Sequence, residues 1–178
     1  MKKQIIISGF GGQGGLAIGK NLVEAGMAEG LEVTWAPSYG PEMRGGTANC
    51  SVVLSDKKVG SPVFASYTEL IALNAPSLDK FEAGVVPGGT VFVNSNVVTD
   101  KVSRSDLTVY YVPCNEIAEK LGNLKVSNMV MLGAYVAATK ILKPETIEAM
   151  IKEMFTGAKA KLVPLNIEAF HEGMACIA

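Results

Sequence analysis

The chain is short, almost neutral and poor in charge: its 178 residues include 16 basic and 17 acidic ones, and only 19% of residues are charged. This length suits one domain with a sizeable core, which we expect over residues 1–178, and the missing basic excess argues against nucleic acid as a partner. No apolar run approaches the roughly 20 residues of a membrane span, and a charge content below the roughly 25% of an average soluble domain favours a surface partly covered by other subunits.

The first elements predicted along the chain are a strand, a glycine turn, a helix and a second strand. Residues 4–8 are a continuous apolar run, which is typical of a strand buried on both faces of a parallel sheet. Two lysines precede this run as in a signal peptide, but the run is too short and glycines interrupt it, so we expect a cytoplasmic protein. The helical pattern ends at Gly30, and residues 31–37 form the next strand.

The rest of the chain alternates strands with turns and then becomes helical. Further strands are predicted at 47–55, 69–75, 90–95 and 107–113, with loops at 38–46 and 86–89 and a short helix after Pro76. Residues 127–142 are apolar on nearly all sides and predict a buried helix, and two more helices begin near Pro144 and Pro164. This order predicts a single-domain, three-layer α/β/α fold with a mostly parallel sheet of about six strands and a Rossmann-like glycine turn after the first strand.

The turn reads "GFGGQGG", in which Gly9, Gly11 and Gly14 have the G-x-G-x-x-G spacing of dinucleotide-binding turns. Glycines let backbone N–H groups approach a phosphate, and the following helix directs its positive end at the anion. An NAD site also needs a carboxylate at the end of the second strand, whereas this strand ends "TWAPS" and Glu32 stands at its start. NAD is therefore disfavoured, and a tight strand-to-helix crossing without a ligand is a further alternative.

A second phosphate motif overlaps the first. Gly14, Gly19 and Lys20 fit G-x-x-x-x-G-K, but Asn21 follows where a P-loop needs the Ser or Thr that binds Mg²⁺. The loop "SYGPEMRGG" at 38–46 adds an arginine, a residue suited to bidentate binding of phosphate or carboxylate. Since loops at the carboxyl ends of neighbouring strands share one crevice, we expect this loop to meet the glycine turn around one anion, unless its charges form a solvated pair or a subunit contact.

The sequence contains few of the side chains that metal ions prefer as ligands. Cys50, Cys114 and Cys176 are widely spaced and odd in number, which predicts neither a disulfide framework, nor a zinc site, nor a complete iron–sulfur cluster. His171 is the single histidine of the sequence. No metal site is expected on this chain, and no residue is assigned as a catalytic acid, base or nucleophile.

Read in order, "GFGGQGG", "SYGPEMRGGTANCSVVLS", "VGSP", "PGGTVFVNS" and "VSNMVMLGA" resemble the gamma subunit of the 2-oxoacid:ferredoxin oxidoreductases, from about residue 4 to the last helices. The "SYGPEMRGGTAN" form is most similar to the 2-oxoglutarate and branched-chain 2-oxoacid members. The resemblance implies an enzyme that oxidises a 2-oxoacid, with 2-oxoglutarate favoured over pyruvate, and coenzyme A to acyl-CoA, CO₂ and reduced ferredoxin.

The same resemblance implies which subunit of the complex holds each cofactor. Thiamine diphosphate with Mg²⁺ belongs to the alpha and beta subunits, iron–sulfur clusters belong to beta and to a ferredoxin-like subunit, and ferredoxin accepts the electrons. This chain is then a non-catalytic subunit that binds coenzyme A and contacts the other subunits. Two alternatives stay open: a subunit that only organises the complex, and a stand-alone NAD-binding oxidoreductase.

The residues expected to bind the cofactor fall into two loops and one helix start. The phosphate-facing turn comprises Gly9, Gly11, Gly12, Gln13 and Gly14. The second loop, which lines the ligand or the subunit interface, comprises Tyr39, Gly40, Glu42, Arg44, Gly45 and Gly46. Asn128 also matches the family pattern, with an N-terminal cap of the buried helix as an equal alternative.

Overall fold

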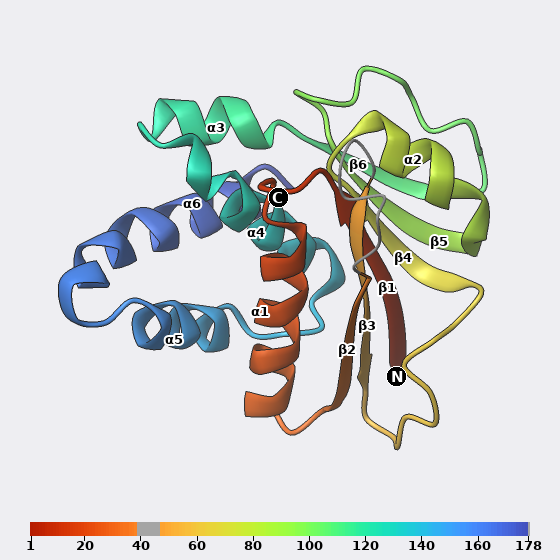
Figure 1. Cartoon of the computed structure of the whole chain (residues 1–178), viewed down its shortest axis with the longest axis horizontal. Coiled ribbons are helices and arrows are strands. Elements are labelled where there is room, and N and C mark those ends of the chain that lie inside the picture. Colours follow the sequence, from red (N-terminus) through yellow and green to blue (C-terminus); the bar gives the residue numbers. More distant parts are fainter. Residues whose placement is uncertain (39–46, 178) are drawn as a thin grey trace.

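A computed structural model describes residues 1–38 and 47–177 of the chain (Figure 1). Within these residues one sheet has six strands in the order β2-β3-β1-β4-β5-β6. The strands are β1 Lys2–Gly9, β2 Glu32–Ser38, β3 Ala48–Ser55, β4 Tyr67–Ala72, β5 Val85–Asn94 and β6 Thr108–Val112. The α-helices are α1 Gly15–Ala28, α2 Ala75–Phe81, α3 Cys114–Lys120, α4 Ser127–Thr139, α5 Pro144–Met154 and α6 Val163–Ala175, and the 3₁₀ helices are η2 Glu82–Gly84, η3 Leu124–Val126 and η4 Gly157–Leu162.

The sheet is mostly parallel, as the sequence predicts. The β1–β4, β4–β5 and β5–β6 pairs are parallel, whereas β3 runs antiparallel to both of its neighbours, β1 and β2. The two strands that α1 connects are consequently not adjacent, because β3 lies between them. The α/β fold with a six-stranded, mostly parallel sheet is confirmed, but the β-turn-α-β unit spans an inserted strand.

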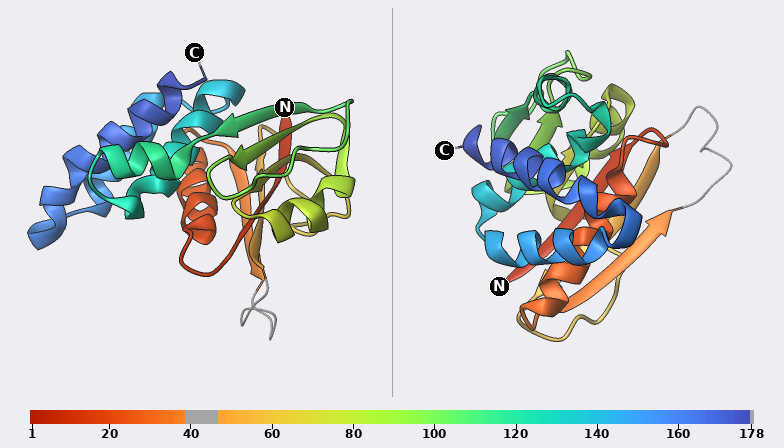
Figure 2. Two further views of the ribbon diagram at one scale, coloured as in Figure 1. Left: turned by 90° about the horizontal axis from the view of Figure 1, so that it is seen from above. Right: turned by 90° about the vertical axis from the view of Figure 1, so that its left-hand side faces the viewer.

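The sheet has a thick helical layer on one face and a thin layer on the other (Figures 1 and 2). Side chains of β1 alternate between the two: Ile5 and Ile7 pack with the cluster that contains α1, α4 and α6, while Ile6 packs with Leu78 of α2. Each of these isoleucines is at most 5% exposed. Burial on both faces explains why the sequence of this strand is continuously apolar rather than alternating.

Helix α4 is the central element of the thick layer. Its residues from Met129 to Val136 are all buried, which confirms the buried helix expected from its apolar sequence. Helix α6 crosses it at backbone contact, since an added Cβ on Gly133 would meet the carbonyl oxygen of Phe170 and one on Gly173 would meet that of Val130. The helix ends at Thr139, three residues before the predicted end, because Lys140 adopts a left-handed conformation with φ of 52°.

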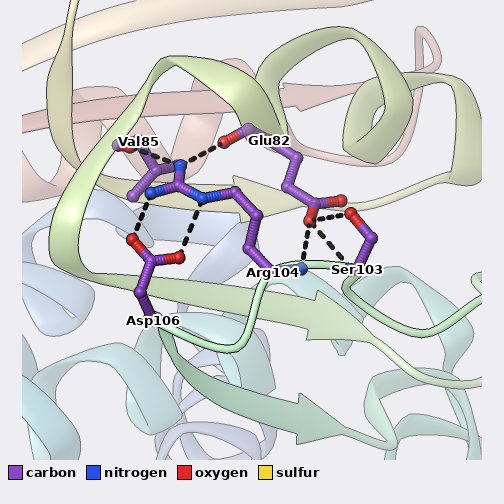
Figure 3. Close-up of polar contacts among 5 residues, drawn as sticks. All are labelled: Glu82, Val85, Ser103, Arg104 and Asp106. Carbon is purple, nitrogen blue, oxygen red and sulfur yellow. Dashed lines mark hydrogen bonds and ion pairs between the residues drawn. The ribbon is translucent and has the colours of Figure 1, made fainter.

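The thin layer comprises α2 and the segment from 95 to 107. Arg104 connects this segment to the start of β5. Its guanidinium donates to both carboxylate oxygens of Asp106, at 3.0 and 2.6 Å (Figure 3). It also donates to the backbone carbonyl oxygens of Val85 and Glu82. The Glu82 carboxylate accepts from the backbone N–H groups of Ser103 and Arg104 at 2.8 and 3.0 Å. Arg104 hydrogen bonding holds the pKa of Asp106 below its usual range, so the pair stays charged.

One predicted turn is wrong. Residues 86–89, "VPGG", were expected to separate two elements, but they lie inside β5. The β4–β5 register shifts between Tyr67 and Glu69, and Gly88 has φ of 76°, so the strand absorbs the turn residues as an irregularity instead of ending there. The proline and glycines of this segment favour a turn, but pairing with β4 determines its conformation.

The order of the strands creates a crevice between β1 and β4. The connection after β1 passes through α1 toward β2 on one side of the sheet, whereas the connection after β4 passes through α2 toward β5 on the other. The chain therefore diverges at the carboxyl ends of these two adjacent strands. Open α/β sheets bind their ligands at such a switch point.

Candidate ligand-binding site

The glycine turn joins β1 to α1 at this switch point. Gly12 and Gly14 have φ of 88° and 82°, a left-handed conformation that glycine adopts without a Cβ penalty. Gly14 is the N-cap of α1 and has no side chain to cap the helix, and no acidic residue occupies the first turn. The first N–H groups of α1 therefore face outward with a positive potential, which suits an anion.

A cavity of about 540 Å³ opens on one side of the turn. Residues of the turn, of the ends of β4 and β5, and of the starts of α3, η3 and α4 line it: Gly12, Gln13, Gly14, Leu73, Asn94, Asn115, Leu124, Lys125, Ser127 and Asn128. Of these described lining residues, Lys125 carries a positive charge and none is acidic. The lining is thus rich in hydrogen-bonding groups and favourable to an anionic ligand.

Two asparagines that line this cavity are hydrogen-bonded to each other. The Asn94 side chain is 4% exposed and donates to the Oδ1 atom of Asn115 at 3.1 Å. The Oδ1 atom of Asn94 accepts from the backbone N–H of Asn96 at 3.3 Å. The Asn94 amide is therefore used within the protein, while the Oδ1 atom of Asn115 accepts from it and Asn115 lines the cavity.

A second cavity, of about 340 Å³, lies beside the same turn. It is lined by Phe10, Gly11, Gly12, Gly14, Gly15, Leu16, Ala17 and Ala48. Gly12 and Gly14 line both cavities, so the turn forms a wall between them. Among the described residues, no atom lies within 4 Å of a Cβ added to Gly11.

Asn128 lies in the first turn of α4 and lines the larger cavity. The N-cap of α4 is Val126, and no side chain caps the helix, so the alternative in which Asn128 is the cap is wrong. The structure brings Asn128 together with Gly12, Gln13 and Gly14 at this cavity, and ligand binding by these residues stays a prediction.

The second predicted loop falls outside the described residues. This applies to Tyr39, Gly40, Glu42, Arg44, Gly45 and Gly46. The strand that follows the loop is described, and its first residue, Ala48, pairs with Gly9 of β1. Strand β3 therefore begins beside the last residue of β1, next to the glycine turn.

Sequence reasoning missed six residues that line the larger cavity: Leu73, Asn94, Asn115, Leu124, Lys125 and Ser127. Asn94 ends β5 and Asn115 follows the proline after β6, so both stand at the carboxyl ends of parallel strands. That position, in "FVNSN" and "VPCNE", was the available signal, because such ends converge on one edge of the sheet. Lys125 had no comparable signal, since its place depends on how η3 approaches the turn.

The structure gives no support to an NAD site. Glu32 begins β2 instead of ending it, and β3 separates β2 from the glycine turn. Among the described residues, no group of three His, Cys, Asp or Glu side chains is arranged to hold a metal ion. Within the same residues, the helices are too short or too polar to cross a bilayer.

Comparison with protein families places these features among known proteins. The family model described as pyruvate ferredoxin/flavodoxin oxidoreductase matches residues 4–176. The ketoisovalerate oxidoreductase subunit VorA of Methanothermobacter thermautotrophicus is 40% identical over 171 residues, which is 96% of this chain but 35% of that protein. This chain thus spans about a third of that relative. The 2-oxoglutarate synthase subunit KorC of Methanocaldococcus jannaschii is 36% identical, with 97% of this chain and 92% of KorC covered.

Solved structures share the fold over nearly the whole chain. The gamma subunit of the keto/oxoacid ferredoxin oxidoreductase from Geobacter sulfurreducens matches with a TM-score of 0.84 and 30% identity, covering 98% of both chains. The 2-oxoglutarate:ferredoxin oxidoreductase from Magnetococcus marinus, whose structure holds 2-oxoglutarate, coenzyme A and succinyl-CoA, matches with a TM-score of 0.89 over 31% of its chain. At 22% identity, this second match supports the fold alone.

Proposed function

The chain belongs to the pyruvate ferredoxin/flavodoxin oxidoreductase family, and from this premise we propose that it is the gamma subunit of a 2-oxoacid:ferredoxin oxidoreductase. The complex converts a 2-oxoacid and coenzyme A to acyl-CoA, CO₂ and reduced ferredoxin. The similarity to KorC over nearly its full length favours 2-oxoglutarate, and the similarity to VorA supports a branched-chain 2-oxoacid as the other choice. Thiamine diphosphate, Mg²⁺ and the iron–sulfur clusters reside on the alpha, beta and ferredoxin-like subunits.

In this proposal, the chain binds coenzyme A at the glycine turn. The observation that supports it is the larger cavity, which joins backbone N–H groups, Asn115, Asn128 and the positive charge of Lys125 without an acidic lining residue among the described ones. Coenzyme A carries a diphosphate and a further phosphate, so a site of this charge attracts it. The cofactor supplies the thiol that accepts the acyl group, and the residues of this chain bind and orient its anionic part.

The charge at the turn is tested with Gly11→Asp, using Gly11→Asn as the uncharged control of the same shape. Both side chains fit against residues 1–38 and 47–177, in which an added Cβ on Gly11 meets no atom within 4 Å. In calorimetric titrations of coenzyme A into the assembled complex, Gly11→Asp should weaken binding about tenfold or more through charge repulsion, equivalent to about 1.4 kcal/mol, and Gly11→Asn much less. Equal affinities for the wild type and Gly11→Asp would remove the site assignment.

A purely organising subunit is the second candidate, and exposed apolar side chains near the cavities favour it. Phe10 is 42% exposed beside the smaller cavity, and Leu124 is 49% exposed beside the larger one. Such side chains suit contact with another subunit. In this case Gly11→Asp changes the yield of assembled complex on size-exclusion chromatography, while coenzyme A affinity in the complexes that do form stays at the wild-type value.

A further inference from the structure

The side chain of Gln13 is directed back into the protein. Its Oε1 atom accepts from the backbone N–H of Phe10 at 2.6 Å, within the turn itself. Its Nε2 atom donates to the carbonyl oxygen of Leu73 at 3.0 Å, just beyond the end of β4. One amide therefore links the turn after β1 to the neighbouring strand across the crevice.

The far side of this link is anchored by a buried polar network. Asn74 is 0% exposed and donates to the Oε1 atom of Gln13 at 3.4 Å, while its own Oδ1 atom accepts from the backbone N–H of Ser77 at 2.9 Å at the start of α2. The Ser77 hydroxyl donates to the hydroxyl of Ser8 in β1 at 2.8 Å. The two strands and α2 are thus joined by hydrogen bonds beneath the turn.

Because Gly9 has no side chain, the Gln13 amide can occupy the space beside its Cα atom. A Cβ added to Gly9 would lie 2.7 Å from the Oε1 atom of Gln13 and 2.9 Å from the Cβ of Leu73, closer than real side chains approach. The first glycine of the motif is therefore explained by the glutamine four residues later, and not by a direct approach to a ligand.

The turn needs such a restraint because of its composition. Five of the seven residues from Gly9 to Gly15 are glycine, which loses more backbone entropy on ordering than any other residue. A free turn of this kind would have to be ordered by its ligand, at a cost in affinity. The Gln13 amide already orders it through donors and acceptors that are largely used within the protein.

We propose that Gln13 is a positioning residue that holds the glycine turn in its anion-binding conformation by tying it to the end of β4. This inference rests on the proposed function in so far as the anion is coenzyme A. It reassigns Gln13 and Gly9 from ligand contacts to parts of one internal brace, and leaves Gly11, Gly12 and Gly14 as the residues of the turn that are proposed to contact the ligand.

The test uses Gln13→Met, which keeps the length of the side chain and removes its hydrogen bonds, in the assembled complex. Hydrogen exchange at the Phe10 amide, measured without ligand by mass spectrometry with residue-level fragmentation, should accelerate about tenfold or more because the amide loses its acceptor. Coenzyme A affinity should fall about tenfold through lost preorganisation. Gln4→Met, the same change at the other end of β1, should alter neither quantity.

Gly9→Ala tests the same hydrogen bonds of Gln13 in a second way. Its methyl group displaces the Gln13 amide, so this variant should also accelerate exchange at Phe10 and weaken coenzyme A binding. Because both changes remove one interaction, the double variant should lose less affinity than the product of the two single losses. Unchanged exchange at Phe10 in Gln13→Met overturns the brace, and faster exchange with unchanged affinity overturns its role in binding. A wild-type complex that does not bind coenzyme A refutes the proposed function instead, while the exchange measurement still decides whether Gln13 holds the turn.

Discussion

Gly14 and Asn128 are packed so closely that no side chain fits between them: a Cβ added to Gly14 would lie 2.7 Å from the Cβ of Asn128. Gly14 closes the turn after β1 and caps α1, while Asn128 lies in the first turn of α4. Two helices that are more than 100 residues apart in the sequence thus begin at one point. Both residues line the larger cavity.

Gly14→Ala should therefore destabilise the protein and weaken coenzyme A binding together. The left-handed φ of 82° at Gly14 costs a residue with a Cβ about 1–2 kcal/mol, and the overlap with Asn128 adds to it. Gly11→Ala is the matched control, since Gly11 has no positive φ and an added Cβ there has no neighbour within 4 Å in the part of the chain that the structure describes. Urea denaturation measures the first effect and calorimetric titration the second. Equal stability of the two variants would contradict the packing described above.

Lys125→Gln tests the charge of the larger cavity without changing the turn. Lys125 lines this cavity, and its backbone is fixed by the side chain of Asn123, which accepts from the Lys125 N–H at 3.0 Å. We expect coenzyme A affinity in the assembled complex to fall about threefold to tenfold at low ionic strength, with a smaller difference at high salt because screening weakens the wild-type attraction. Lys161→Gln, in η4 and outside the lining of this cavity, is the control. A loss of equal size in the control would show a general charge effect instead of a local one.

The fold was largely predictable because its main signals are local. The apolar run of β1, the glycines after it and the apolar helix α4 each specify one element by burial or backbone conformation. The antiparallel insertion of β3 between β1 and β2 was not predictable in this way, because an isolated strand carries no mark of its neighbour or direction. The turn predicted at 86–89 failed for the same reason, since pairing with β4 decided its conformation.

For the candidate site, the position of the glycine turn could be predicted from the sequence, whereas the contacts of most side chains could not. Gly12, Gly14 and Asn128 line one cavity as grouped from the sequence. The internal role of Gln13 was hidden, because its partners Leu73 and Asn74 are sixty residues away and contribute a carbonyl oxygen and an amide that no motif specifies. Contacts between distant segments require the strand order, which the sequence pattern left open.

Tyr135→Phe should destabilise the protein, because it removes the hydrogen bond that the Tyr135 hydroxyl donates to the buried carboxylate of Glu69. Glu69 is 1% exposed, and its two oxygens lie 2.6 Å from the Lys3 ammonium and 2.6 Å from the Tyr135 hydroxyl, which donates to it. Removing the hydroxyl leaves one oxygen without a donor in the core, at a cost of about 1–3 kcal/mol. Tyr110→Phe is the control: its ring stacks on Phe92 with centroids 5.2 Å apart, and Phe retains that contact. The free energy of unfolding in urea should separate the two variants, and equal values would show that the hydroxyl contributes little.

Cys50 should make the protein less stable at alkaline pH. The side chain is 0% exposed under α1, and burial raises the pKa of the thiol to about 11, with a smaller opposing effect of Trp35. In the unfolded chain the thiol ionises at its ordinary pKa of 9.0, so between pH 9 and 11 the unfolded state has lost a proton that the folded state retains. Fewer protons on the unfolded state mean that stability falls as pH rises through this window, by about 2 kcal/mol in total from this group.

The measurement is the free energy of unfolding of the wild type and Cys50→Ala from pH 7 to pH 11. The variant carries a constant packing cost at all pH values but lacks the titrating thiol, so its stability should fall less steeply above pH 9 and approach that of the wild type. Taking the difference between the two proteins cancels the other alkaline groups, such as Tyr67, whose pKa burial raises to about 12. The same burial makes Cys50 unreactive, and iodoacetamide at pH 8 should leave it unmodified in the folded protein while modifying it in urea. Parallel stability curves, or rapid modification of the folded chain at Cys50, would contradict a thiol held neutral by burial under α1.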